Sequence, residues 1–270
     1  MGAQSGKVEE PESGASPFSW AAATHSGLRR PSNEDSYCAR PDLSLFVVAD
    51  GMGGHVAGEV ASQLTVKTLE AFVERTAALT KDDTWPFPFE PDLSVQANRL
   101  KAGIRMANRR LADEQAHESA LKGMATTASA VLLGRGPAAI AHVGDSRVYL
   151  LRGGVLQRLT ADHSWVEEQV RAGTMTPSAA RQHPWRNVVT RALSGGHEPE
   201  VDTREQELRP LDRLLICSDG LSGVVPDATI GDLLGQGKAL DEVSDSLVDE
   251  ANRAGGPDNV TVLVLAIDAP

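Results

Sequence analysis

Hydrophobic positions along the first half of the chain follow two spacings, one typical of strands and one typical of helices. Residues 18–25 alternate, and residues 43–49 are continuously apolar, so both predict strands, the second buried on both faces. Residues 56–79 and 93–120 repeat apolar side chains three and four positions apart, which predicts two long amphipathic helices. Three prolines between them, in residues 81–91, predict a loop.

Glycine-rich turns organise the second half of the chain. Two pairs of short apolar runs flank such turns, and these four strands in series predict an antiparallel sheet: 126–133 with 138–143, and 147–151 with 155–159. Residues 211–217 and 260–267 predict two further buried strands, and residues 230–234 and 240–251 predict short helices. Hairpins with grouped helices favour the α+β class over a doubly wound parallel sheet.

Composition and charge narrow the class of protein. The 270 residues are 41% hydrophobic and 23% charged, as in folded globular domains, and we expect one domain over residues 18–268. Residues 1–17 are polar and lack the apolar segment of a secretory signal, so we expect a disordered or expression-derived tail. The formal net charge of −11 has the wrong sign for a protein that binds nucleic acid or anionic membranes through charge.

Compartment and membrane association follow from other counts. The most apolar runs are under ten residues long, against the roughly twenty needed to cross a bilayer, so no membrane segment is expected. Cys38 and Cys217 are far apart and each adjoins a predicted strand, which argues against a disulfide framework and against a thiolate zinc site. We therefore expect a cytoplasmic protein.

Three aspartates stand at the ends of strongly apolar runs. Asp50 and Asp219 follow predicted strands and precede glycine, and Asp258 lies just before the last strand. Any one of them alone is most simply a turn residue. If the strand ends converge, however, two carboxylates about 5 Å apart repel by roughly 3 kcal/mol at an effective dielectric constant near 20, and a divalent cation would relieve that repulsion. An all-oxygen ligand set selects Mg²⁺ or Mn²⁺ rather than zinc.

A cation site of this kind suits hydrolysis at phosphorus. Such ions lower the pKa of a bound water, which attacks the phosphorus atom, while a second ion steadies the substrate oxygens. Arg29 and Arg30, shortly before Glu34, supply a candidate phosphate clamp, because the guanidinium fork matches phosphate oxygens in a bidentate way. The alternative is a solvated pair of surface arginines.

Seven ordered motifs carry a family resemblance. They resemble those of the bacterial type-2C metal-dependent protein phosphatases, the PPM family: RxxNED at 30–35, DGMGGH at 50–55, GMATT at 123–127, HVGDSR at 142–147, TADHS at 160–164, CSDGL at 217–221 and GGPDNVT at 255–261. The resemblance implies an αββα sandwich of two antiparallel sheets flanked by helix pairs. It also implies hydrolysis of phosphoserine and phosphothreonine in proteins by direct attack of a metal-bridging water or hydroxide, without a covalent phosphoenzyme.

The resemblance implies two Mn²⁺ or Mg²⁺ ions in a core and a third, weaker ion. Asp50 resembles the carboxylate that bridges the two core metals, and the carbonyl of Gly51 a ligand of the second. Asp219 and Asp258 resemble the remaining ligands of the first metal. Asp145, together with Asp219, resembles the ligands of the third ion.

Other positions match the family's substrate-handling groups. Arg30 matches the phosphate-binding arginine, and Glu34 and Asp35 match acidic groups that hold metal-bound waters. The polar, helical insertion over residues 162–192 is similar to the flap that lies beside the site and bears on substrate choice. The implied partners are phosphoprotein substrates, a cognate Ser/Thr kinase and the targets of that kinase, and we expect a monomer.

One departure concerns the general acid. Animal members of the family carry a histidine two residues after the metal aspartate, where this chain has Met52, whose thioether cannot donate a proton. His55 is a weak substitute, because a histidine in a glycine turn is more often structural. The leaving group would then take its proton from a metal-bound water or another group.

Rival interpretations are weaker. A dinucleotide-binding fingerprint fails because its third glycine would fall on Val56. A serine esterase built on Ser146 lacks a His and Asp partner pattern. A pseudophosphatase that only binds should have lost a metal aspartate or the arginine, and hydrolysis of a chromogenic phosphate ester would discriminate. The aromatic loop over residues 81–91 is either a partner contact or folds back on its own domain.

Overall fold

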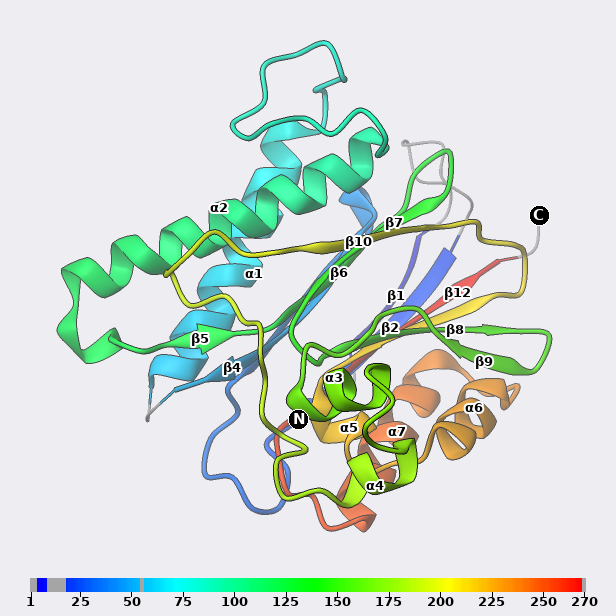
Figure 1. Ribbon diagram of the computed structural model, residues 1–270. Coiled ribbons are helices and arrows are strands. Elements are labelled where there is room, and N and C mark those ends of the chain that lie inside the picture. The colour runs from blue at the N-terminus through cyan, green and yellow to red at the C-terminus, as the bar shows by residue number, and fades with distance from the viewer. Residues whose placement is uncertain (1–3, 9–17, 54–55, 269–270) are drawn as a thin grey trace.

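Two antiparallel sheets lie face to face, with helices on the outer face of each (Figure 1). The computed structural model describes residues 4–8, 18–53 and 56–268. The first sheet has the strand order β1 (Gln4–Val8), β2 (Phe18–His25), β12 (Val260–Ile267), β11 (Arg213–Cys217), β8 (Arg147–Arg152) and β9 (Val155–Arg158). The second has the order β10 (Asp202–Gln206), β7 (Ala138–Val143), β6 (Ala128–Leu132), β4 (Leu45–Met52) and β3 (Asp35–Arg40), with β5 (Ala125–Thr126) paired to the end of β4.

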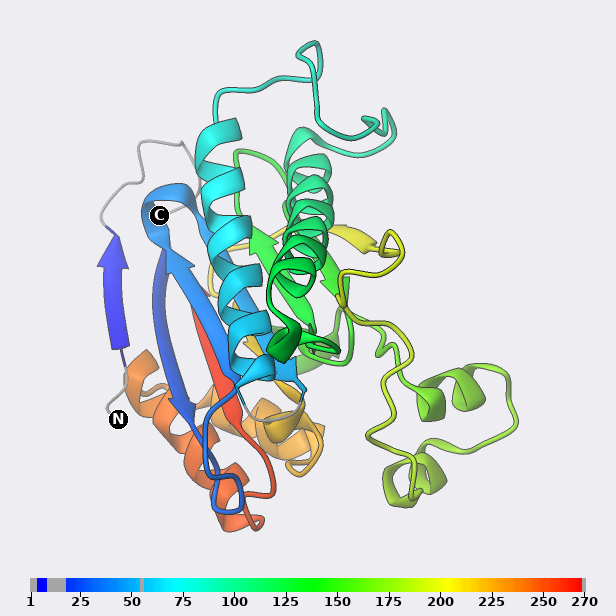
Figure 2. The same ribbon diagram turned by 90° about the vertical axis from the view of Figure 1, so that its left-hand side faces the viewer.

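The helices form two outer layers and one projection (Figure 2). The second sheet is covered by α1 (Ala57–Thr76) and α2 (Val95–His117), and the first by α5 (Asp219–Ser222), α6 (Asp227–Gly235) and α7 (Leu240–Arg253). Short α3 (Trp165–Arg171) and α4 (Pro177–Gln182) project to one side, and two 3₁₀ turns, η1 (Pro41–Leu43) and η2 (Ser119–Leu121), connect other elements. The predicted α+β sandwich is confirmed.

Strand β4 illustrates how the core forms. Phe46 and Val48 point between the sheets, whereas Leu45, Val47 and Ala49 point towards α1 and α2, and all five are fully buried. Because successive side chains leave opposite faces of a strand, a central strand covered on both faces must be apolar throughout. The ring of Phe46 packs edge to face against the ring of Phe18, which belongs to the other sheet, and the two centroids are 5.5 Å apart.

The two predicted hairpins exist, but the expectation of one sheet in series is wrong. Strands β6 and β7 belong to the second sheet, and β8 and β9 belong to the first. The turn at residues 144–146 carries the chain from one sheet to the other, and β8 then pairs with β11 rather than with β7. Local periodicity predicts each hairpin, whereas the partner of a hairpin's outer edge depends on long-range packing.

Three polar strands carry no periodic apolar signal. Strands β3 and β10 are edge strands of the second sheet. Backbone hydrogen bonds to β4 and β7 hold them in place, although their side chains are not apolar on both faces. Strand β1 lies in the predicted N-terminal tail and pairs with β2. The expectation that this tail is disordered is therefore wrong for residues 4–8. The rest of the predicted tail, residues 1–3 and 9–17, lies outside the described residues.

The aromatic loop over residues 81–91 folds back on its own domain. Phe87 is buried, and the guanidinium of Arg109 lies 4.1 Å from the centroid of its ring. Trp85 donates its indole N–H to the carbonyl oxygen of Thr80 at 2.9 Å. These aromatic side chains are therefore occupied within the domain. Among the helices of the described segments, none combines the length and the apolar character needed to cross a membrane.

Candidate active site

A cleft of about 500 Å³ opens at the end of the sandwich, lined by the end of β4 and the start of α5. It collects segments that are far apart in the sequence. The predicted site residues that line it are Arg30, Glu34, Asp50, Gly51, Asp145, Asp219 and Asp258. Asn187 and Asn259 line it as well. The predicted strand ends therefore do converge.

The main chain at Asp50 is held firmly. Asp50 donates its N–H to the hydroxyl of Thr127 at 2.9 Å, and its carbonyl oxygen accepts from the N–H of Thr127 at 2.9 Å. A Cβ atom at Gly51 would lie only 2.1 Å from the carbonyl oxygen of Gly58, so only glycine allows α1 to approach β4 this closely. Strand β4 runs on through Asp50 to Met52 rather than ending before the carboxylate as the apolar pattern suggested.

The carboxylates in the cleft disfavour each other's charge. Burial raises the pKa of Asp50 well above its usual range, and the neighbouring aspartates, Asp35 first, raise it further. Burial and the charge of Asp258 raise the pKa of Asp219 to about 6, against the effect of a hydrogen bond with Asp50. One carboxylate oxygen of Asp219, Oδ1, is buried without a hydrogen-bond partner among the described residues. A bound cation would stabilise the charged form of this cluster of carboxylates.

Asp145 lies in the turn between β7 and β8. It is 7% exposed, and burial raises the pKa of its carboxyl well above the usual range, with further contributions from Asp219 and Asp162. Two side-chain hydroxyls connect this turn to β4. The hydroxyl of Ser146 lies 2.8 Å from that of Thr127, which in turn accepts the N–H of Asp50. Thr127 lies in the GMATT motif, but no local pattern in the sequence marks it as the partner of Asp50.

Arg30 faces the cleft from an exposed loop. Its guanidinium donates to a carboxylate oxygen of Asp258 at 2.8 Å, and 54% of its side chain is exposed. Asn259 holds the loop in place: its amide nitrogen donates to the carbonyl oxygens of Ser26 and Ser32 at 3.0 and 2.7 Å, and its amide oxygen accepts from the N–H of Glu34 at 2.8 Å. Asn259 is a second organising residue that only the contacts identify.

Asp35 lies behind the cleft rather than in it. Strand pairing sets it opposite Asp50, and its buried carboxylate accepts a hydrogen bond from the hydroxyl of Ser218 at 2.8 Å. Burial raises the pKa of Asp35 to about 7. Its proposed contact with metal-bound water stays a prediction. Met52 lines the cleft, and His55, the weak candidate for the general acid, lies outside the described residues.

The donor set fits hard divalent ions. In the described part of the chain, no three Asp, Glu, His or Cys side chains already surround one point closely enough to hold an ion. Ions such as Mg²⁺ keep several of their waters and need only one or two carboxylates each. The buried, unpartnered Oδ1 of Asp219 and the several carboxylates that line the cleft suit such ions, whereas zinc prefers nitrogen and sulfur ligands.

The insertion over residues 162–192 forms a second wall next to the cleft. It contains α3 and α4, and a further cleft of about 570 Å³ lies between these helices and α5. Asp145, Asn187 and Asp219 line both clefts, so the two are continuous. A substrate bound at the carboxylates would therefore have room to extend along the insertion.

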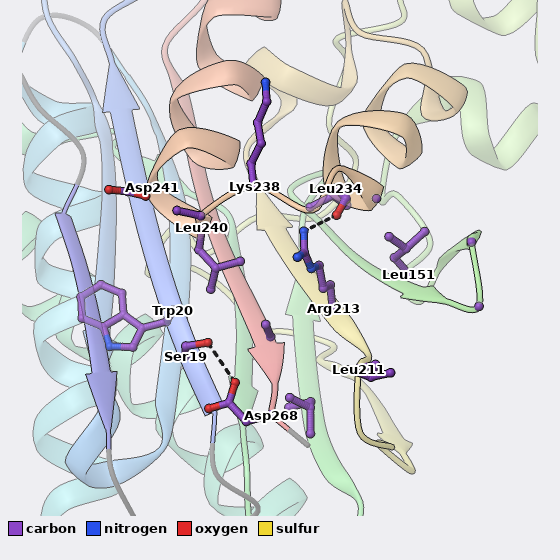
Figure 3. A pocket seen from close by; sticks show the side chains of 16 residues that line it. Ser19, Trp20, Leu151, Leu211, Arg213, Leu234, Lys238, Leu240, Asp241 and Asp268 are labelled. Carbon is purple, nitrogen blue, oxygen red and sulfur yellow. Dashed lines mark hydrogen bonds between the residues drawn. The ribbon is translucent and has the colours of Figure 1, made fainter. Parts of the chain in front are cut away.

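A larger cleft of about 950 Å³ lies at the other end of the first sheet (Figure 3). It is lined by the start of β2, the end of β12 and the connection between α6 and α7. Its most central cation, Arg213, already donates to the carbonyl oxygens of Leu234 and Gln236. The hydroxyl of Ser19, also in its lining, donates a hydrogen bond to the carboxylate of Asp268 (Figure 3). This cleft lacks the converging carboxylates of the first one.

Comparisons with known proteins agree with this geometry. The family model described as Protein phosphatase 2C matches residues 28–256. The serine/threonine protein phosphatase PstP of Mycobacterium tuberculosis is 43% identical over 248 residues, which are 91% of this chain but 44% of that protein. The chain thus spans less than half the length of this relative.

Other relatives match over nearly their whole length. The serine/threonine phosphatase stp of Listeria monocytogenes is 38% identical over 251 residues, covering 91% of this chain and 94% of that protein. A crystal structure of the catalytic domain of PstP in complex with two manganese ions is 38% identical, covers 93% of this chain and 99% of that chain, and superposes with a TM-score of 0.77.

Proposed function

Because the chain belongs to the protein phosphatase 2C family, we propose that it removes phosphate from phosphoserine and phosphothreonine in proteins, with Mn²⁺ or Mg²⁺ as its cofactor. The observation that carries this proposal is the convergence of Asp50, Asp145, Asp219 and Asp258 with Arg30 in one cleft. The manganese ions in the related catalytic domain support the choice of cofactor.

The proposed ligands divide between two core ions and a third, weaker one. We assign Asp50, the carbonyl of Gly51, Asp219 and Asp258 to the core, and Asp145 with Asp219 to the third ion. Bound ions of this type supply a water of lowered pKa and neutralise charge on the phosphate oxygens. The raised pKa values of Asp50, Asp145 and Asp219 support the assignment, because they reflect burial of these carboxylates and the closeness of other negative groups, and a cation would offset both effects.

The protein's own groups bind and orient the substrate. The exposed guanidinium of Arg30 can turn from Asp258 to a phosphate while its loop stays fixed by Asn259. Glu34 lines the same cleft, which supports its proposed role of holding water at the metals, whereas Asp35 would act from behind Asp50. The continuous second cleft supports the proposal that the insertion contacts the peptide on either side of the phosphorylated residue.

The proposed activity also implies a class of substrates. We propose phosphoproteins modified by a cognate Ser/Thr kinase, including that kinase. Cys38 and Cys217 are both buried and free, which supports a reducing, cytoplasmic setting for this activity. Release of phosphate from a phosphothreonine peptide in the presence of Mn²⁺ is the direct test, and a chain that binds the peptide without hydrolysing it would be a pseudophosphatase.

Replacing Arg30 by alanine should raise KM for a phosphothreonine peptide more than it lowers kcat. The guanidinium binds phosphate in the ground state and in the transition state alike, so its loss removes uniform binding. Steady-state kinetics check this. Arg29→Ala is the matched control and should change little, because Arg30 and not Arg29 lines the cleft. An unchanged KM with a lower melting temperature would instead mean that Arg30 is structural.

Replacing Asp145 by alanine should lower turnover of the peptide far more than turnover of p-nitrophenyl phosphate. A departing threonine oxygen needs a proton and nitrophenolate does not. Met52 has no proton to give, so the third-ion site at Asp145 is the proposed origin of that proton. Equal losses on both substrates would point to a role in binding, and no loss on either would make Asp145 a turn residue only.

A further inference from the structure

The turn that carries Asp145 is held by a residue from another segment. His163, just before α3, donates its N–H to the carbonyl oxygen of Gly144 at 2.7 Å. Its ring atom Nδ1 accepts the N–H of Gly144 at 3.0 Å. One residue thus satisfies both backbone groups of the position before Asp145. His163 is 3% exposed, so neither bond competes with bulk water.

The opposite side of the turn is closed by Thr127. Gly144 has a φ of +111°, and a Cβ atom there would lie 2.5 Å from the methyl carbon of Thr127. The backbone is therefore confined between Thr127 and His163 in a conformation that favours glycine. Asp145 follows directly, so its direction into the cleft depends on this confinement.

The tautomer of His163 follows from its contacts. Because Nδ1 accepts a hydrogen bond, the proton of the neutral ring is on Nε2. Nε2 lies 3.2 Å from a carboxylate oxygen of Asp202 on β10, close enough for the Nε2–H dipole to be attracted to that carboxylate though outside good hydrogen-bond alignment. The ring also packs against that of His142, tilted by 32° and with centroids 4.8 Å apart. Asp202 and His142 thus fix the orientation of the His163 ring.

His163 also joins the two ends of the insertion. Its carbonyl oxygen accepts the N–H of Thr190 at 2.8 Å, and the next residue, Ser164, forms a β-bridge with Val189. The base of the insertion and the Asp145 turn therefore share one anchoring residue.

We propose that His163, oriented by Asp202, is a positioning residue that holds the Gly144–Ser146 turn so that Asp145 faces the cleft. The consequence for metal binding rests on the proposed function, because it takes Asp145 as a ligand of the weaker third ion. The backbone part of the proposal is independent of any metal. Partners that orient ligands in this way typically change metal affinity by about 10-fold to 100-fold when they are lost.

The first test uses metal-free protein. Hydrogen–deuterium exchange of a peptide covering residues 143–147 should be about tenfold faster in His163→Ala than in wild type, because the Gly144 N–H loses its acceptor. Exchange in β11 and β12 should not change. His163→Asn should restore much of the protection, because an amide oxygen can occupy the place of Nδ1.

The second test measures Mn²⁺ binding by calorimetry. His163→Ala should weaken the third site about tenfold or more and leave the two tight sites unchanged. Asp202→Asn should give a smaller loss in the same direction. Glu200→Gln is the matched control, because both carboxylates pair with Arg191 but Asp202 alone of the two contacts His163.

Two results would overturn the proposal. Unchanged exchange at residues 143–147 in His163→Ala would show that the turn needs no clamp. Faster exchange with an unchanged third site would show that the clamp does not position Asp145. If wild type bound two Mn²⁺ ions only, the third-metal assignment would fail, while the exchange experiment would still decide on the clamp itself.

Discussion

Hydrolysis of a phosphothreonine peptide should stop completely when EDTA is added, and it should return when excess Mn²⁺ or Mg²⁺ is supplied. The physical reason is the cluster of carboxylates in the cleft, where burial first and neighbouring negative charges second raise the pKa values of Asp50 and Asp219. Without a cation these groups repel an incoming phosphate dianion as well as one another. The measurement is phosphate release over time at fixed peptide concentration.

The same titration has a second readout in stability. Mn²⁺ at one hundred times its dissociation constant should stabilise the fold by about 2.7 kcal/mol, provided that the ion binds only the folded state. Circular dichroism should show an intact fold in EDTA, because the hydrophobic layers between the sheets do not involve the cleft. Full activity in excess chelator would refute the metal-dependent mechanism, whatever the melting temperature does.

Asp219→Asn should abolish turnover while leaving the fold intact. The substitution replaces a ligand oxygen by an amide nitrogen that cannot coordinate a cation, at a carboxylate whose Oδ1 is buried and unpartnered among the described residues. Loss of a group that only orients a metal ligand lowers metal affinity or activity by about 10-fold to 100-fold. We therefore expect kcat to fall by more than about 100-fold for a ligand itself. Asp258→Asn should behave in the same way.

The metal-free form of Asp219→Asn gives the sharper contrast. Removing one negative charge relieves repulsion with Asp258, so its melting temperature without metal should equal or exceed that of wild type. The stabilisation by Mn²⁺ should shrink at the same time. Asp232→Asn, on the exposed side of α6, is the control and should keep both activity and metal response. A variant that unfolds, or one that retains activity, would contradict the assignment of Asp219.

Local sequence pattern determined the elements that carry the site. Residues 18–25 and 260–267 form β2 and β12 with the predicted bounds, because apolar alternation and continuous apolar runs reflect how many faces of a strand are buried. The aspartates at the ends of apolar runs could be identified for the same reason. Their chemistry indicated a cation, and with it a phosphate substrate, on the condition that these strand ends converge.

Only the tertiary structure decided which elements meet. The polar edge strands β3 and β10 are held through backbone pairing, which leaves no apolar period to detect, and yet they deliver Asp35 and Asp202 to the back of the cleft and to His163. The two hairpins, β6 with β7 and β8 with β9, belong to different sheets because their outer strands pair with strands that are distant in the sequence. Contacts between distant segments, such as Asn259 with the Arg30 loop and His163 with Gly144, exist only where the packed sheets bring those segments together. Sequence fixes the chemistry available at each strand end because side-chain type and burial are local properties, whereas the approach of those ends is set by long-range packing.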